Sequence, residues 1–470
     1  MTLRTLFVFG LVLMINFLSA QTLNYYYGNL HSHSGYSDGN KDSSSTGVSK
    51  PAGDYSFAKL SQHFDFLGIA EHNHYSSANN PGMIVTSYAL GLSQAAAANQ
   101  PGTFLALYGM EWGVSSTNAG HVVIYGFNQL IGWETSVPGV SGPNYDIFNA
   151  KTDYDGLFRK VKNNPATFCY LAHPYKTDFN SLSLSSYNSA YDSAIVAVPY
   201  RSGLAFSTST NYNDYPAGDY FDYYKQMLKT GYHLGAGYDH DNHNLTFGRN
   251  NAGRLVIMAP ALTQADLFTA MKKRHFYGSD DWNCKMSFNI GTSMMGDTTS
   301  GSIDPVINAV HNDGDGETAD SLKIWSGVPG GNAPTVLTSV LNLNTISYTD
   351  NSLAVGATKY YFIEVQQADG DRIVSSPIWY TKRAFVGIEE IEKNVDFVMF
   401  PNPTNSKLNI STGYNGKYFI EITDVSGKIV YKENYTVPNA NIITSEFAKG
   451  FYSIKVSSET FTRTKKLVIE

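Results

Sequence analysis

The feature that most constrains this chain is the placement of its histidines. Eight of the 12 histidines in the 470-residue sequence fall into five groups, each at a boundary between an apolar run and a polar loop. The groups comprise His31 with His33, His72 with His74, His121, His173, and His240 with His243. Paired histidines beside acids are costly to bury unless they bind a ligand. We therefore expect a fold that brings several strand ends together around one polar pocket.

The apolar runs alternate with helix candidates through the first part of the chain. The expected strands are 25–30, 64–70, 104–110, 121–127, 167–172, 194–198, 233–237 and 255–259. The expected helices are 154–162, 220–229 and 263–274. This alternation predicts an α/β barrel or a doubly wound sheet, whose parallel strands all end on one face. Most histidine groups follow a strand, whereas His121 opens one.

The spacing within these groups favours metal binding. In an extended strand the pair His31 and His33 places both imidazoles on one side, because side chains alternate with a period of two. Asp241 and His243 have the same spacing, and a carboxylate such as Glu111 can bridge two ions. Mixed nitrogen and oxygen ligands suit Zn²⁺, Mn²⁺ or Fe²⁺. We expect two or three divalent metal ions as cofactors.

The ordered set of motifs resembles the polymerase-and-histidinol-phosphatase (PHP) family of metal-dependent phosphoesterases. The motifs are His31-x-His33 with Ser37-Asp38-Gly39, Glu71-His72-Asn73, Gly109-x-Glu111, the later His121, Ala172-His173-Pro174 and Asp241-x-His243. The resemblance implies a PHP-like distorted (β/α)7 barrel over 21–283. It also implies a set of metal ligands at His31, His33, Asp38, His72, Glu111, His121, His173, Asp241 and His243. A following β-sandwich makes the chain most similar to a secreted metallohydrolase branch that includes carbamate-cleaving enzymes.

Two residues depart from that pattern or complicate it. Glu71 stands where the family usually has Asp, which puts the geometry around the ligands in doubt. Asp239 lies close enough to Asp241 in the sequence to compete with it as a ligand.

The implied reaction is hydrolysis of a phosphoester by a metal-bridged hydroxide, formed near neutral pH because metal ions lower the pKa of water. We expect His74 or His240 to protonate the leaving oxygen, and Arg249 or Arg254 to hold a phosphate. The substrate is then a small-molecule phosphoester or ester. Two alternatives stay open: a carboxylic ester, carbamate or amide hydrolase, and a non-catalytic, metal-stabilised binding protein at the cell surface.

The rest of the chain predicts β-structure. We expect a β-sandwich over 284–382, a charged linker over 383–396, and a small β-sandwich over 397–470. Within the first sandwich, the acidic stretch 312–317 partly resembles a Ca²⁺ loop, but it lacks the full spacing and a β-turn is the better interpretation.

The C-terminal segment resembles the sorting domain of the type IX secretion system of Bacteroidetes. The resemblance rests on Phe400-Pro401-Asn402-Pro403-Thr404, the strand-like stretch 450–456 and the basic and apolar end 465–470. It implies contact with the type IX secretion machinery and export to the medium or the outer cell surface.

The N-terminus and the composition agree with export. Residues 1–20 read as a secretory signal peptide whose apolar run is too short to favour a permanent span, although an uncleaved anchor is the alternative. With 33 Lys and Arg against 40 Asp and Glu, and with no dense basic patch, extended nucleic-acid binding is not expected. Cys169 and Cys284 are either paired or two buried free thiols.

Overall fold

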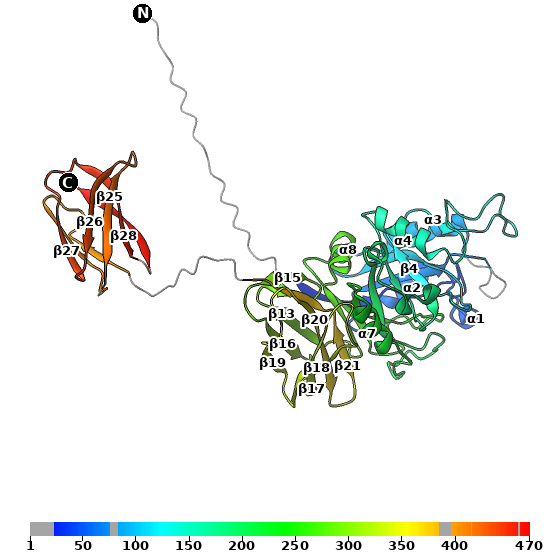
Figure 1. Ribbon diagram of the computed structural model, residues 1–470. Coiled ribbons are helices and arrows are strands. Elements are labelled where there is room, and N and C mark those ends of the chain that lie inside the picture. The colour runs from blue at the N-terminus through cyan, green and yellow to red at the C-terminus, as the bar shows by residue number, and fades with distance from the viewer. Residues whose placement is uncertain (1–22, 76–82, 385–395, 415, 459–460) are drawn as a thin grey trace, which may run out of the picture. The chain divides into compact units, whose positions relative to one another are not determined.

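The computed structural model describes residues 23–75, 83–384, 396–414, 416–458 and 461–470. The expected signal peptide 1–20 and most of the expected linker 383–396 lie outside the described residues. The chain divides into two compact units, one within 1–384 and the other within 385–470 (Figure 1). No helix among the described residues is both long and apolar enough to cross a membrane.

The first part of the larger unit is built on a mixed sheet. In hydrogen-bonded order its strands are β10 (Gly235–Asp239), β8 (Ile195–Ser202), β7 (Phe168–Leu171), β4 (Val122–Tyr125), β3 (Leu105–Trp112), β2 (Phe66–His72), β1 (Asn24–Asn29), β11 (Arg254–Ala259) and β12 (Phe276–Ser279). All of them are largely buried, as the apolar runs predict, and each predicted strand overlaps an observed one.

The connections between these strands contain helices. They are α1 (Ser43–Thr46), α2 (Pro51–Ala58), α3 (Val85–Ala98), α4 (Tyr154–Asn163), α5 (Asp178–Ser181), the 3₁₀ helix η1 (Leu182–Leu184), α6 (Ser189–Asp192), α7 (Phe221–Thr230) and α8 (Gln264–Lys273). The three predicted helices are confirmed as α4, α7 and α8. Helix α4 begins where the side chain of Asp153 accepts the N–H of Gly156, and it buries Leu157 and Val161. Helix α8 begins at a similar cap on Thr263.

Strand direction places the histidine groups on one edge of the sheet. Strands β1, β2, β3, β7, β8 and β10 share one direction, whereas β4 and β11 run the opposite way. The carboxyl ends of the first six strands and the amino end of β4 therefore lie on the same edge. This direction explains His121, which precedes β4 yet reaches the edge where the other histidines follow their strands.

The predicted PHP-like distorted (β/α)7 barrel is wrong. Strands account for 39% of the chain and helices for 16%. Strands β4 and β11 are antiparallel to their neighbours, and residues 113–121, which join β3 to β4, contain no helix. The hydrogen-bonded order ends at β10 on one side and passes from β12 into β21 on the other, so the described strands do not close into a barrel. Apolar patterns do not encode strand direction or the partner of a terminal strand. For this reason the sequence pattern led to the wrong prediction of a closed barrel.

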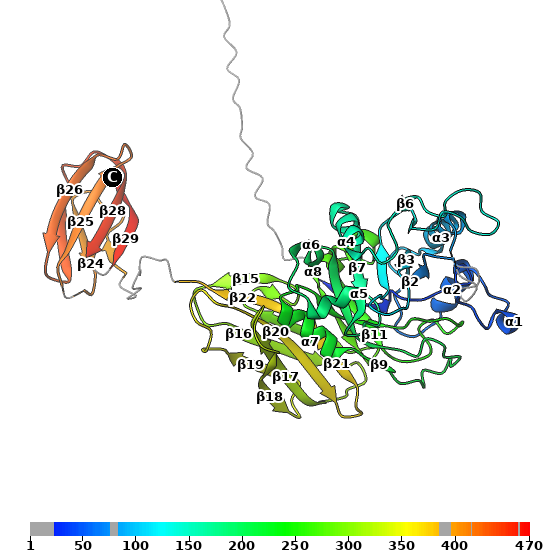
Figure 2. The same ribbon diagram turned by 45° about the vertical axis from the view of Figure 1, so that its right-hand side comes forward.

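The second part of the larger unit consists of two facing sheets. One continues from β12 through β21 (Arg372–Ser375), β20 (Thr358–Gln367), β17 (Ala319–Gly327) and β18 (Thr335–Leu341), with β22 (Ile378–Lys382) and β15 (Thr298–Gly301) alongside. The other contains β14 (Ser293–Met294), β13 (Lys285–Ile290), β16 (Val306–Asn312) and β19 (Thr345–Thr349). Alternate residues such as Phe288 and Ile307 fill the core between them with Ile324 and Ile363. Helix α7 packs on the first sheet through Phe221 (Figure 2).

Three short two-residue strands complete the larger unit: β5 (Ile131–Gly132), β6 (Ile147–Phe148) and β9 (Gly218–Asp219). The smaller unit contains a sheet of β23 (Val398–Phe400), β24 (Lys407–Ser411) and β27 (Asn439–Ile443), and a sheet of β26 (Ile429–Tyr435), β25 (Tyr418–Asp424), β28 (Gly450–Ser458) and β29 (Thr462–Ile469). Leu408, Ile420 and Ile454 lie in the core that the two sheets share.

Candidate metal centre

The carboxylate of Glu111, on strand β3, is surrounded by histidine nitrogens. Oε1 lies 3.1 Å from His31 Nε2, 2.9 Å from His121 Nδ1 and 3.0 Å from His173 Nε2. Oε2 lies 2.9 Å from His72 Nδ1 and 3.3 Å from His33 Nε2. Glu111 is fully buried, and its histidine neighbours come from four different strand ends. The predicted convergence of remote histidines on one point is therefore observed.

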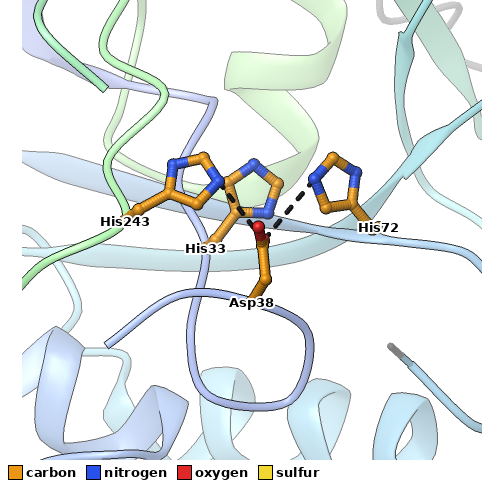
Figure 3. Close-up of side chains that lie close together, drawn as sticks. All are labelled: His33, Asp38, His72 and His243. Carbon is orange, nitrogen blue, oxygen red and sulfur yellow. Dashed lines mark ion pairs between the residues drawn. The ribbon is translucent and has the colours of Figure 1, made fainter. Parts of the chain in front are cut away.

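Asp38 forms a second focus beside it. Figure 3 shows its carboxylate pointing toward the imidazoles of His33, His72 and His243. Its Oδ1 lies 3.2 Å from His243 Nε2 and 3.5 Å from His72 Nε2. One ligand atom from each of these four residues lies within 4.8 Å of the others.

Asp241 links the loop after β10 to the loop after β1. Its Oδ1 lies 3.3 Å from His31 Nε2 and 3.1 Å from His33 Nε2. The N–H of Asp241 donates to the carbonyl of His31 at 2.9 Å, and the N–H of His33 donates to the carbonyl of Asn242 at 2.8 Å. Asp241 has φ 54° and His173 has φ 27°. Non-glycine residues held in this left-handed region are strained, and such strain gathers at functional sites.

The nine predicted metal ligands are thus brought together in three overlapping groups. The groups are His33, Asp38, His72 and His243; His31, His33, Glu111 and Asp241; and His72, Glu111 and His121. The ninth residue, His173, joins through its contact with Glu111.

Other groups orient these side chains. Asp239 Oδ2 lies 2.8 Å from Nδ1 of His31, which turns Nε2 of that ring toward Glu111. Asp239 therefore supports His31 and does not replace Asp241. The ring of His243 is oriented likewise, since its Nδ1 lies 2.8 Å from the carbonyl of Asp241. Partners of this kind fix the ring orientation of metal-binding histidines.

Glu71 orients the loop that carries His33 and Asp38. Its carboxylate oxygens accept the N–H of Ser34 at 3.1 and 3.2 Å and also contact the hydroxyls of Ser34 and Ser37. The longer side chain of Glu71 thus reaches this loop through Ser37, which belongs to the Ser-Asp-Gly motif, and through Ser34, to which the sequence assigned no role.

The electrostatics of the site favour positive charge. Burial disfavours the ionised form of Glu111, but the neighbouring histidines His121 and His31 outweigh it and hold its pKa well below the usual value. Burial also opposes the charged form of His33, yet its bonds to Asp241 and Glu111 raise its pKa to about 10. For His72 burial dominates and lowers the pKa to about 4, so this ring is neutral with a free lone pair at pH 7.

Bound metal ions would satisfy the buried donor atoms of this site better than hydrogen bonds among the residues do. Five of their buried atoms make no hydrogen bond: His31 Nε2, Asp38 Oδ1, His72 Nδ1, Glu111 Oε2 and His121 Nε2. Several of these atoms nevertheless approach a neighbour within 2.9–3.5 Å. Such close approach without hydrogen-bond geometry is expected of ligand atoms that face a common point. The nitrogen and oxygen donors suit Zn²⁺, Mn²⁺ or Fe²⁺.

Seven of the nine predicted ligands, all except the fully buried His31 and His33, line a cavity of about 410 Å³. Tyr175, Leu204, Phe206 and Tyr220 line its walls. Among the described residues that line it there is no lysine or arginine. These wall residues come from long loops in which aromatic residues are common, so the sequence contained no signal that would have marked them.

The predicted catalytic residues are not all at this cavity. His240 is fully buried, its Nε2 lies 2.7 Å from the carbonyl of Gly253, and burial lowers its pKa to about 3. Arg254 is also fully buried and donates to the backbone carbonyls of Gln62, His63, Gly248, Asn251 and Gly253. His240 therefore cannot reach a leaving group, and Arg254 has no donor left for a phosphate.

The two remaining predicted residues, His74 and Arg249, do not line the cavity either. His74 is near the site: its ring stacks on Trp133 with the ring centroids 5.5 Å apart, and its centroid lies 5.9 Å from that of the tilted His72 ring. It does not line the cavity. Arg249 donates to the carbonyl of Leu60 at 3.0 Å and packs on Phe57, outside the cavity. Cys169 and Cys284 are both buried and free.

Comparison with known protein families matches residues 398–470 to the secretion system C-terminal sorting domain. The predicted type IX sorting domain is confirmed, and the protein is secreted or located at the outer cell surface. No curated protein sequence matches the chain.

Three solved structures have low similarity to this chain. The FN1–FN3 domains of chicken CNTN1 are 12% identical, with 37% of this chain and 62% of that chain covered and a TM-score of 0.17. The fibronectin(III)-like modules of Clostridium thermocellum CbhA are 12% identical, with 39% and 94% covered and a TM-score of 0.17. A two-domain fibronectin type-III segment of chicken tenascin is 9% identical, with 39% and 99% covered and a TM-score of 0.14. TM-scores this low support no conclusion about the fold or function of this chain. The sorting domain at 398–470 is the part of the chain that matches a known family.

Proposed function

We propose that the protein is a secreted metal-dependent hydrolase that cleaves ester bonds, with phosphoesters as its first substrate class. The observation that carries the proposal is the set of buried nitrogen and oxygen atoms that approach one another without hydrogen-bond geometry. The residues that would hold the ions are His31, His33, Asp38, His72, Glu111, His121, His173, Asp241 and His243. Bound divalent ions would act as Lewis acids and make water nucleophilic near neutral pH.

The chain itself supplies orientation and hydrogen bonds. Asp239 and Glu71 keep His31 and the His33 loop in position before a substrate arrives. The hydroxyls of Ser202 and Tyr220 lie at the cavity wall, 3.4 Å apart. Burial raises the pKa of Tyr220 to about 12, so its hydroxyl stays protonated and can donate to charge that develops on a leaving oxygen. We assign this role to Tyr220 in place of His240.

One observation favours a second candidate, hydrolysis of a carboxylic ester, carbamate or amide. The cavity walls are aromatic or apolar at Tyr175, Leu204 and Phe206, and no arginine or lysine lines the cavity among the described residues. A doubly charged phosphate monoester usually gains from an arginine fork. A neutral carbonyl substrate or a singly charged phosphodiester needs no such partner.

The test compares three substrates on the purified protein loaded with Mn²⁺ or Zn²⁺: p-nitrophenyl phosphate, bis-p-nitrophenyl phosphate and p-nitrophenyl acetate. We expect turnover of a phosphate substrate, the diester above the monoester. His33→Ala should abolish the activity, whereas His63→Ala, at an exposed histidine outside the cavity, should retain it.

The outcomes separate the alternatives. Turnover of the acetate alone would replace phosphoester hydrolysis by carbonyl hydrolysis. Tight metal binding without turnover of any substrate would favour a metal-stabilised surface-binding protein.

A further inference from the structure

A second cavity adjoins the cavity of the candidate metal centre. It has a volume of about 530 Å³ and lies between the loop after β7, the 3₁₀ helix η1 and helix α7. Tyr175 and Tyr220 line both cavities, and the ring of Tyr175 is 71% exposed. The lining of the second cavity is mostly apolar, and none of the nine predicted metal ligands belongs to it. Small-molecule sites are typically apolar pockets of about 300–1,000 Å³, so this cavity is large enough for part of a substrate.

Exposed apolar side chains gather around these two cavities. Between residues 23 and 283, the described residues include nine large apolar side chains that are exposed. Four of the nine line one or both cavities: Tyr175, Leu184, Leu204 and Phe206. Exposed apolar side chains that cluster beside a pocket are typical of a ligand-binding groove. Their position indicates that a ligand of the metal centre carries an apolar part.

The charged side chains around the second cavity indicate what kind of apolar group fits it. Each of its two acids lies 2.8 Å from a basic partner, in the pairs Asp219 with Arg372 and Asp222 with Lys225. Lys176 and Lys229 also line the cavity, and neither forms an ion pair with any described residue. Aromatic walls can attract a cation, but two unpaired lysines disfavour one here. An uncharged apolar group is therefore the better occupant.

Tyr220 relates the second cavity to the chemistry of the first. Its hydroxyl is the group to which we assign donation to the leaving oxygen, and its side chain lines both cavities. A group attached to that oxygen would extend past Tyr220, away from the metal centre. We propose that the second cavity binds the leaving group of the substrate, and that this leaving group is an apolar, uncharged phenol or alcohol. The inference rests on the proposed hydrolase function and narrows its substrates to esters of such compounds.

Leu184 allows the second cavity to be tested without changing the first. It belongs to η1, is 52% exposed and lines only the second cavity. Leu184→Asp would place a charge beside the apolar ligand, which disfavours binding, whereas an exposed position should tolerate the change in the folded protein. Leu90→Asp is the matched control, because Leu90 lies on helix α3, is 54% exposed and lines neither cavity.

The test is calorimetric titration of the full protein, loaded with Zn²⁺, with two phosphonates that cannot be hydrolysed: 2-naphthylmethylphosphonate and methylphosphonate. We expect the naphthyl compound to bind about ten-fold more tightly or better, because its rings bury apolar surface in the second cavity. Leu184→Asp should remove most of this difference, and Leu90→Asp should keep it. Tyr175→Ala, at a side chain that lines both cavities, should also reduce it, so the assignment does not depend on one variant.

Three results would overturn the assignment. They are equal affinity for the two phosphonates, an unchanged preference in Leu184→Asp, and tighter binding of phenyltrimethylammonium than of 2-naphthol, which would show that the cavity selects cations. Failure of the hydrolase proposal gives a different result. In that case no ester is cleaved, yet 2-naphthol binds to the wild type and about ten-fold more weakly to Leu184→Asp. If this inference alone fails, esters are cleaved and kcat/KM for 2-naphthyl phosphate is the same in Leu184→Asp and the wild type.

Discussion

Asp239 Oδ2 lies 2.8 Å from Nδ1 of the buried His31 ring, and this contact determines which nitrogen of His31 faces Glu111. If His31 is a metal ligand, removing Asp239 should free the ring to rotate and lower its basicity. We expect Asp239→Ala to weaken metal binding by about 10–100-fold without removing a ligand. Competition with a chromophoric chelator measures the affinity. Asp320→Ala, at an exposed carboxylate of strand β17 outside the cavity, is the matched control, and unchanged affinity in Asp239→Ala would show that the carboxylate serves the fold alone.

Glu71 offers a second test of orientation. Its carboxylate holds Ser34 and Ser37 on the loop between His33 and Asp38. Glu71→Asp shortens the side chain by one methylene, so the contacts to this loop should be lost. We expect weaker metal binding in Glu71→Asp, with a larger loss in Glu71→Ala, both measured by the same chelator competition. Equal affinity in all three proteins would mean that the loop is oriented without Glu71.

Arg254 should matter for stability and not for substrate affinity. Arg254→Met would remove the donor to five backbone carbonyls, three of them in buried contacts, although the carbonyl of Gly253 keeps its contact with His240. We expect the free energy of unfolding to fall by roughly 3 kcal/mol or more, measured by urea denaturation. A phosphate-binding role predicts the reverse pattern, in which KM for a phosphoester rises while stability is unchanged.

Asp350 should make stability depend on pH. Burial opposes its ionisation, but bonds from Lys359, Ser352 and Tyr361 outweigh this and lower its pKa to about 2, against an ordinary value of 3.8. A carboxylate whose pKa is lower in the folded state stabilises the protein above its unfolded pKa, and this contribution is lost as the pH falls through the folded pKa. The contribution is therefore complete at pH 7 and declines from about pH 4 toward pH 2.

Asp350 is 1% exposed, so its pKa shift converts to about 2 kcal/mol of stability at pH 7. We expect Asp350→Asn to lose about this much at pH 7 and about half as much at pH 3, measured by urea denaturation at each pH. The same loss at both pH values would assign the effect to hydrogen bonds and not to the charge.

The sequence contained enough to predict the candidate site but not the sheet that carries it. Short apolar runs followed by His, Asp or Glu identify residues such as His33 and Glu111, because strand ends are the places where buried runs meet polar loops. His121 is an exception to this pattern because it precedes strand β4. The antiparallel direction of β4 brings it to the same edge of the sheet as the other histidines. Direction depends on pairing partners and not on the run itself, so the predicted barrel was wrong.

Residues that act through others were the hardest to predict. Arg254 follows the last histidine motif in the sequence, yet its guanidinium lies among backbone carbonyls. Tyr220 and Phe206 carry no motif and reach the cavity only because their loops fold over it.

The central claim is that the side chains around Glu111 and Asp38 bind metal ions. Elemental analysis by inductively coupled plasma mass spectrometry on protein purified without added metal or chelator tests it most directly. We expect two or three transition-metal ions per chain in the wild type and a clear reduction in Glu111→Gln, with His63→Ala unchanged. Wild-type protein that is folded but contains no transition metal, and takes up none from Zn²⁺ or Mn²⁺ solutions, would contradict the account.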